Sequence, residues 1–287
     1  MKQKPDNFQT VTPEVLAWIA AETALGRSND AIFKALLDAG WQYAAARQAM
    51  RLTAQEASAF ANPPSLPPLV AVPSVAVADA GATLDAGDKW VTVLQRQQDP
   101  DLVVFGNFLS ASECEALMDA ARPRLSRSLT VDIKTGGEEL NGDRTSQGMF
   151  FTRGENAVVH RVEARIAKLL NWPVQNGEGL QVLRYAQGAE YKPHYDYFDP
   201  AEPGTPSILQ RGGQRVATLI MYLHAPEQGG ATVFPDIERQ VAPQRGNAVF
   251  FSYARAHPGS HTLHGGEPVT AGEKWIATKW LREREFR

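Results

Sequence analysis

The sequence predicts a mainly β domain with flanking helices, folded as a double-stranded β-helix (jelly roll) and preceded by a small three-helix module. After Pro173, short apolar stretches alternate with clusters of glycine and proline, and no helical pattern separates them. Strands that follow one another through turns alone favour an antiparallel double-sheet barrel. The first 58 residues instead carry apolar side chains at helical spacing.

Residues 1–58 are expected to form three short helices. Pro13 after Thr12 is typical of a helix start, and Gly40 is typical of a helix end. The Ala39-Gly40-Trp41 turn and the alanine-rich segment after it resemble ubiquitin-associated-like three-helix modules. This resemblance implies a docking module for a protein partner, and a purely structural role stays open.

Residues 59–88 are rich in proline and alanine and are expected to be a linker. Residues 89–287 then form the second domain. Its expected elements are helices at residues 110–121 and 155–170 and strands at residues 102–105, 180–185, 191–195, 215–223, 231–234, 247–253 and 274–281.

Composition narrows the classes of function. The formal net charge of −3 argues against sequence-independent binding to nucleic acid or to an acidic membrane surface. The single cysteine, Cys114, excludes an intramolecular disulfide and a cysteine-rich zinc site. The first residues lack the apolar core of a secretory signal, and no apolar run reaches the length of a membrane span. We therefore expect a cytoplasmic protein without a nucleic-acid or membrane partner.

His194 and Asp196 are the first candidate metal ligands. They lie two positions apart in an expected strand, so their side chains share one face. With a second histidine from another strand they would form the two-histidine, one-carboxylate set that leaves coordination positions open on non-haem Fe(II). A His-x-Asp pair also occurs as an ordinary surface pair, so the prediction depends on the rest of the sequence.

We select His264 as the third ligand and Lys274 as a cation beside it. These residues flank a segment containing glycine and proline that is expected to join two strands. Lys274 would pair with the C5 carboxylate of 2-oxoglutarate, because a buried carboxylate without a charge partner is very costly. An exposed strand lysine is the alternative. On either face, alternation places Thr278 and Trp280 beside Lys274.

Four ordered sequence blocks resemble the catalytic domain of prolyl 4-hydroxylases, which are Fe(II)/2-oxoglutarate-dependent dioxygenases. They are residues 194–198 (HYDYF), 213–223 (GQRVATLIMYL), 229–235 (GGATVFP) and 272–280 (GEKWIATKW). The segment Arg144-Thr145-Ser146 also resembles that family. The resemblance extends from about residue 100 to the end of the chain and leaves the first 88 residues outside it.

The resemblance implies a role for each matching position. It implies His194, Asp196 and His264 as ligands of Fe(2+), and Lys274 as the partner of the 2-oxoglutarate C5 carboxylate. It suggests Tyr185, Tyr222 and Thr278 as further contacts of 2-oxoglutarate and Arg215 as a contact of a peptide substrate; core aromatic residues and a surface arginine are the alternatives. It also implies O2 as cosubstrate and L-ascorbate as a possible reductant.

The function that the resemblance implies is hydroxylation of a peptidyl proline at carbon 4 in an intracellular protein or peptide, giving succinate and CO2. Three alternatives stay open. The same oxygenase chemistry could act on another side chain or a small metabolite. The barrel could be a non-catalytic binding protein that recruits partners through its N-terminal helices. The same three ligands could hold a structural zinc ion.

Overall fold

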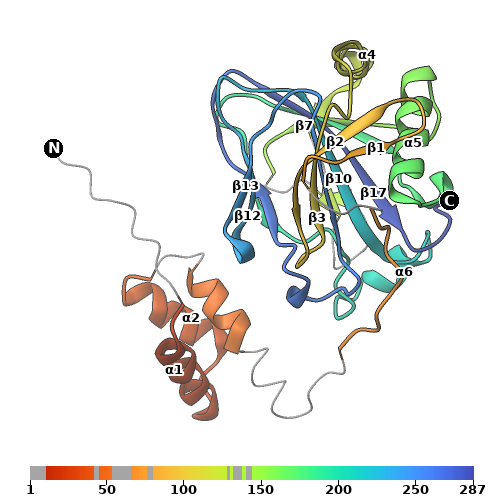
Figure 1. Ribbon diagram of the computed structural model, residues 1–287. Coiled ribbons are helices and arrows are strands. Elements are labelled where there is room, and N and C mark those ends of the chain that lie inside the picture. Colours follow the sequence, from red (N-terminus) through yellow and green to blue (C-terminus); the bar gives the residue numbers. More distant parts are fainter. Residues whose placement is uncertain are drawn as a thin grey trace. The chain divides into compact units, whose positions relative to one another are not determined.

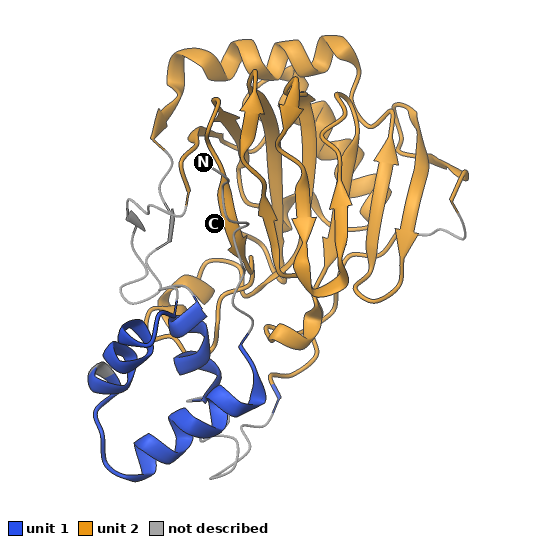
Figure 2. Ribbon diagram, turned by 90° about the vertical axis from the view of Figure 1, so that its left-hand side faces the viewer, with its two compact units in different colours: residues 1–66 blue, residues 67–287 orange. Residues whose placement is uncertain are grey.

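The computed structural model describes residues 11–41, 45–53, 66–75, 80–127, 130–131, 138–139 and 144–287. The chain divides into two compact units, residues 1–66 and residues 67–287, and each is described by itself (Figure 2). Among the described residues, no helix combines the length and apolar character that crossing a membrane requires.

The first unit is helical, as the sequence predicts. Its described helices are α1 (Pro13–Ala24), α2 (Asn29–Asp38) and a third helix over residues 45–53. The α2 helix begins where the Ser28 hydroxyl accepts a hydrogen bond from the Ala31 backbone amide, which satisfies one of the unpaired donors at a helix start. The three helices bury a small core together, made of Ile19, Ile32, Leu36, Ala46 and Ala49.

The second unit contains a large antiparallel sheet (Figure 1). In spatial order its strands are β1 (Thr83–Asp85), β2 (Trp90–Gln97), β3 (Leu102–Gly106), β14 (Ala248–Ser252), β10 (Arg215–His224), β17 (Lys274–Arg282), β8 (Leu180–Tyr185), β7 (Gln147–Phe151) and β4 (Ser126–Arg127). The predicted strands 180–185, 215–223 and 274–281 agree with β8, β10 and β17 to within one residue. The sequence analysis missed β1, β2 and β7.

A second, four-stranded sheet is formed by β13 (Arg239–Val241), β12 (Thr232–Phe234), β15 (His264–Gly266) and β9 (Tyr191–His194). Two short pairs complete the strands, β11 (Gln228–Gly229) with β16 (Val269–Ala271) and β5 (Thr130–Val131) with β6 (Glu138–Glu139). Short 3-10 turns lie at Arg122–Arg124, Val174–Asn176, Pro235–Ile237 and Pro258–Ser260. Two antiparallel sheets with few helices confirm the predicted jelly-roll class.

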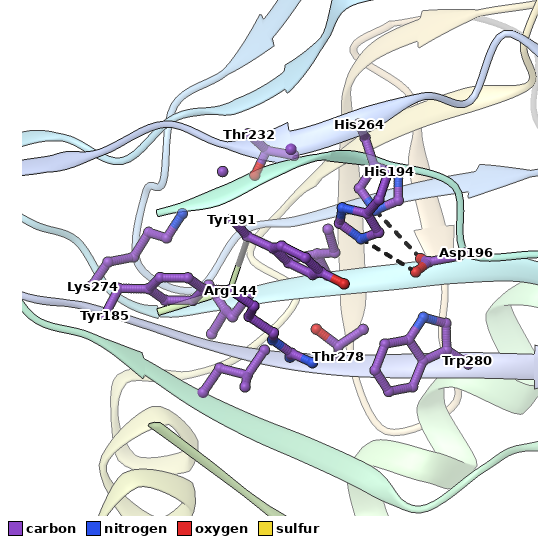
Figure 3. A pocket seen from close by; sticks show the side chains of 15 residues that line it. Arg144, Tyr185, Tyr191, His194, Asp196, Thr232, His264, Lys274, Thr278 and Trp280 are labelled. Atoms are coloured by element: carbon purple, nitrogen blue, oxygen red, sulfur yellow. Dashed lines mark ion pairs between the residues drawn. The ribbon is translucent and has the colours of Figure 1, made fainter. Parts of the chain in front are cut away.

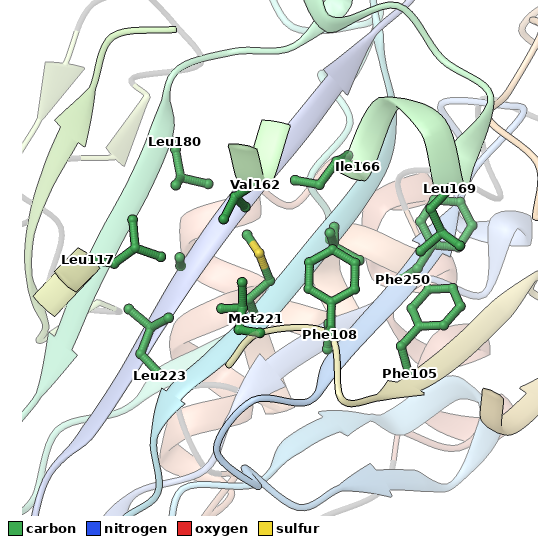
Figure 4. Packing of buried hydrophobic residues seen from close by; sticks show 14 of the residues in the cluster. Phe105, Phe108, Leu117, Val162, Ile166, Leu169, Leu180, Met221, Leu223 and Phe250 are labelled. Atoms are coloured by element: carbon green, nitrogen blue, oxygen red, sulfur yellow. The ribbon is translucent and has the colours of Figure 1, made fainter. Parts of the chain in front are cut away.

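Helices α4 (Ala111–Ala121) and α5 (Ala157–Leu170) cover one face of the large sheet, and α6 (Thr205–Leu209) is a single short turn. Leu117 of α4 and Val162 and Ile166 of α5 pack against Met221 and Leu223 of β10 (Figure 4). The α4 helix begins with the predicted capping box, in which Ser110 and Glu113 each bond the other's backbone amide. This apolar layer makes the large sheet a rigid support.

The opposite face of the large sheet looks toward the small sheet. Along β10, Ile220 and Tyr222 point to this second core, because successive side chains of a strand alternate between faces. Phe234 of β12 and Tyr191 of β9 contribute from the small sheet. The space between the two sheets is therefore where a site can be built.

Residues 67–75 are part of the second unit, although the sequence placed them in the linker. The backbone amide of Val70 donates to the Ala254 carbonyl, Arg255 donates to the Pro67 carbonyl, and Val75 is only 5% exposed within the main core. The predicted linker also contains β1. Val70 and Val75 bury apolar surface that a free linker would leave in water, so the packed unit begins near residue 67.

Candidate active site

Three metal-binding side chains converge between the two sheets. His194 ends β9 and His264 begins β15, and these two residues are directly opposite each other in the antiparallel register. Asp196 follows two residues after His194. The ligand atoms of the three residues all lie within 4.8 Å of one another, and the Asp196 carboxylate lies 3.6 Å from His194 Nε2 and 3.4 Å from His264 Nε2 (Figure 3).

The backbone orients both imidazoles in the same way. His194 Nδ1 lies 2.9 Å from the Lys192 carbonyl oxygen, and His264 Nδ1 lies 3.0 Å from the Thr262 carbonyl oxygen. A carbonyl can only accept, so each Nδ1 donates its proton there, and each Nε2 is the ring nitrogen left for a metal beside Asp196. The Tyr191 ring stacks on His194 with 3.7 Å between ring centroids, which restricts the imidazole further.

The protonation states match those of metal ligands. Burial lowers the pKa of His194, and the neighbouring His264 lowers it further, so the neutral imidazole is favoured. Burial by itself would raise the pKa of Asp196. The charge of His264 and hydrogen bonds with both histidines outweigh that effect and hold the pKa of Asp196 well below its ordinary value. An ionised carboxylate and two imidazoles that face a pocket fit Fe(II) with open coordination positions.

Lys274 lies at the other end of the same pocket, at the start of β17 (Figure 3). It is 2% exposed, and its ammonium donates to the Gly230 carbonyl oxygen at 2.7 Å. No carboxylate of the described residues lies within ion-pair distance of it. Burial lowers the pKa of Lys274 to about 8, with Glu267 opposing the shift. A buried cation facing a pocket is suited to an anionic ligand group.

The other predicted contacts separate into two groups. Tyr185 and Thr278 line the pocket with Lys274, whose ammonium lies 4.9 Å from the centroid of the Tyr185 ring. Tyr222 stands behind the wall, where its hydroxyl donates to Thr232, a residue that does line the pocket. Arg215 lies outside the lining and pairs with Glu178 at 2.7 Å.

Arg144 and Trp280 line the pocket and were not assigned roles from the sequence. Arg144 forms an isolated β-bridge with Tyr191, and its guanidinium lies over the ring of that residue. Trp280 lines the pocket on the Asp196 side, and its indole N–H is buried with no hydrogen-bond partner among the described residues (Figure 3). The alternation from Lys274 placed Trp280 on this face. Arg144 belongs to a segment that resembles the family, but no local pattern gave it a role, because one long-range bridge brings it to the pocket.

Comparison with known proteins defines the class. Residues 180–282 match the family model described as "2OG-Fe(II) oxygenase superfamily". These residues include the converging ligands and Lys274. The jelly-roll fold, the His-Asp-His cluster and this match together define a non-haem Fe(II)/2-oxoglutarate-dependent dioxygenase.

The curated relatives narrow the class to a family. Prolyl 4-hydroxylase 5 of Arabidopsis thaliana is 40% identical over 222 residues, which cover 70% of this chain and 74% of the relative. Prolyl 4-hydroxylase 1 of the same plant is 42% identical over 203 residues, covering 64% and 70% of the two chains. This chain belongs to the prolyl 4-hydroxylase family.

A solved structure agrees with this placement. The viral collagen prolyl hydroxylase of Paramecium Bursaria Chlorella virus-1, in its 2-oxoglutarate complex, is 33% identical, with a TM-score of 0.50. The match covers 63% of this chain and 95% of that chain. It therefore supports the fold of the oxygenase unit.

Proposed function

We propose that this dioxygenase hydroxylates a peptidyl proline at carbon 4 in an intracellular protein or peptide. The observation that carries the proposal is the pairing, in one pocket, of the His194, Asp196 and His264 cluster with the buried cation Lys274. Bound Fe(II) and 2-oxoglutarate would together activate O2 to hydroxylate an unactivated C–H bond, with succinate and CO2 as co-products.

The protein's own part in this reaction is to bind, orient and exclude water. We assign the three converging side chains as the iron ligands and Lys274 as the partner of the C5 carboxylate of 2-oxoglutarate. Tyr185 and Thr278 would contact the cosubstrate beside Lys274, and Tyr222 would act on it through Thr232. The relatives' printed activity on proline supports the choice of substrate.

Trp280 is a candidate for orienting the substrate. Its buried indole N–H has no partner among the described residues, and a buried donor of this kind is costly unless a ligand accepts from it. We propose that it donates to a carbonyl of the bound peptide. Arg215 stacks over the Trp280 ring at 4.1 Å and donates to the Asp196 carbonyl. It would therefore support the substrate contact from behind the pocket wall.

Three finer features belong to the same proposal. The N-terminal helices would dock a protein partner, which is supported by the exposed side chains of Trp18 (36%) and Leu37 (37%). L-ascorbate would return oxidised iron to Fe(II). A cytoplasmic location is compatible with a single buried cysteine, because the fold depends on no disulfide.

The test is turnover of proline-containing peptides by enzyme purified without oxygen, loaded with Fe(II) and then supplied with 2-oxoglutarate and air. We expect succinate release together with a mass gain of one oxygen atom on proline. His194→Ala should abolish both, because two ligands hold the metal poorly. Full turnover in that variant would remove His194 from the site.

The same assay distinguishes the alternatives. Succinate release without proline oxidation in any peptide would favour another substrate for the same chemistry. No O2-dependent turnover after iron loading would favour a binding protein or a structural zinc site.

A further inference from the structure

A chain of two hydroxyl groups reaches Asp196 from residues outside the pocket lining. Thr218 Oγ1 lies 2.7 Å from Asp196 Oδ2, and the Tyr253 hydroxyl lies 2.9 Å from Thr218 Oγ1. Thr218 and Tyr253 are 0% and 2% exposed, and neither lines the pocket. These two residues have no place in the function proposed above.

The direction of both hydrogen bonds follows from chemistry. An ionised carboxylate has no proton and can only accept, so the single hydroxyl proton of Thr218 is donated to Asp196 Oδ2. The oxygen of Thr218 is then left as an acceptor, and the Tyr253 hydroxyl must donate to it. The order is therefore Tyr253 to Thr218 to Asp196, and each donor is satisfied.

The surrounding strands hold this chain in place. Thr218 lies in the middle of β10, in register with Phe251 on one neighbouring strand and Trp280 on the other. The Tyr253 backbone amide donates to the Val216 carbonyl, which ties the start of the following loop to β10. Asp196 Oδ2 therefore has two polar neighbours, the Thr218 hydroxyl at 2.7 Å and His264 Nε2 at 3.4 Å.

We propose that Thr218 and Tyr253 are positioning residues that hold Asp196 as a one-oxygen metal ligand. Thr218 donates to Oδ2, which also lies 3.4 Å from His264 Nε2, whereas Oδ1 lies 3.6 Å from His194 Nε2 and accepts nothing from Thr218. We assign Oδ1 as the oxygen that would bind the metal. A carboxylate can bind a metal through one or both oxygens. If Oδ2 does not bind the metal, the coordination positions that 2-oxoglutarate and O2 need stay open.

The test measures metal binding without any peptide, so its outcome is independent of whether proline is the substrate. Apoenzyme is titrated with Mn(II), and free Mn(II) is followed by electron paramagnetic resonance. Thr218→Val keeps the shape of the side chain and removes the hydroxyl, and we expect affinity to fall about 10- to 100-fold. Thr218→Ser keeps the hydroxyl and should restore most of the affinity.

Two further variants test the chain itself. Tyr253→Phe should weaken Mn(II) binding less than Thr218→Val does, and it should add no further loss in the Thr218→Val background, because Tyr253 acts through Thr218. Thr205→Val is the matched control. It removes the hydroxyl of another buried threonine, one that donates to the Asp199 backbone carbonyl and lies outside the pocket lining, and it should leave Mn(II) affinity unchanged.

The absorption spectrum of the Co(II)-loaded enzyme gives a second signal, since it reports coordination number. We expect Thr218→Val to change the spectrum and Thr205→Val to leave it unchanged. The proposal is overturned if folded Thr218→Val binds Mn(II) as the unaltered protein does, or if Thr218→Ser loses as much affinity as Thr218→Val. An equal loss from Tyr253→Phe with and without the Thr218 hydroxyl would also overturn it.

Discussion

Lys274 titrates in a range that makes its role measurable. Its pKa is about 8 because burial disfavours the ammonium. Glu267 opposes this shift, and burial raises the pKa of the facing Tyr185 hydroxyl, which therefore stays protonated over the same range. A bound carboxylate favours the charged form, so it raises the pKa of Lys274 in the complex.

The affinity for 2-oxoglutarate should therefore fall as the pH rises. Below about pH 8 the ammonium is present in the free protein, and the affinity for 2-oxoglutarate is then greatest. As the pH rises through that value, affinity should fall by up to about tenfold per unit, because binding must first restore the proton. Calorimetry of 2-oxoglutarate binding to the Mn(II)-loaded enzyme measures this affinity at each pH. Lys274→Met should bind more weakly with no such slope, and a flat profile in the unaltered protein would contradict the assignment.

The pairing of β9 with β15 depends on Gly265. A Cβ added there would lie 2.9 Å from the Tyr191 carbonyl oxygen and 3.0 Å from the Pro193 nitrogen. Both are backbone atoms of β9, so the strands would have to separate. The register between them already shifts from His264 to Gly266. A small residue at this point is what lets His264 lie opposite His194.

We therefore expect Gly265→Ala to weaken Mn(II) binding at least about tenfold, because the two imidazoles would move apart. The matched control is Gly106→Ala in β3. There the added carbon meets only the side chain of Leu94, which is 43% exposed and can move. Metal titration and circular dichroism on both variants are the measurements. Unchanged binding in Gly265→Ala would show that the strand spacing is not critical.

The two compact units lead to a truncation experiment. A chain beginning at Pro67 keeps the contacts of Val70 and Val75 with the oxygenase unit and should hydroxylate peptides as the full chain does. A chain beginning at residue 80 loses them. Burial of one valine is worth about 1.5–3 kcal/mol. In a domain of this size each kcal/mol corresponds to roughly 2–4 °C of melting temperature.

Thermal unfolding and peptide turnover of both truncated chains check this expectation. The longer chain should melt as the oxygenase unit does within the full protein, and the shorter chain should melt several degrees lower. Loss of peptide turnover in the longer chain would show that the N-terminal helices take part in the reaction. Equal melting of the two chains would show that residues 67–75 contribute no stability.

Several features were predictable from the sequence because they depend on near neighbours. Alternation along a strand is local, so Lys274, Thr278 and Trp280 had to share a face. The Ser110 and Glu113 capping box needs only four consecutive residues. The edges of the sheet were harder to predict. The five residues of β7, QGMFF, show no clear apolar alternation, and this strand forms through its pairing with β8.

From the sequence alone, the turn-separated strands determined the class of the large domain, and the spacing of His194 and Asp196 predicted that their side chains share a face. The structure brings the two together in another way, since β9 ends at His194 and Asp196 follows in a bend. The sequence left open whether Lys274 faces the pocket or the solvent, it indicated Arg144 only through a resemblance without a role, and it gave no sign of the hydroxyl chain from Tyr253. The fold settled these because strand register and sheet packing join residues far apart in the chain. His264 lies directly opposite His194 because β15 pairs with β9, which is also a contact between residues far apart in the chain.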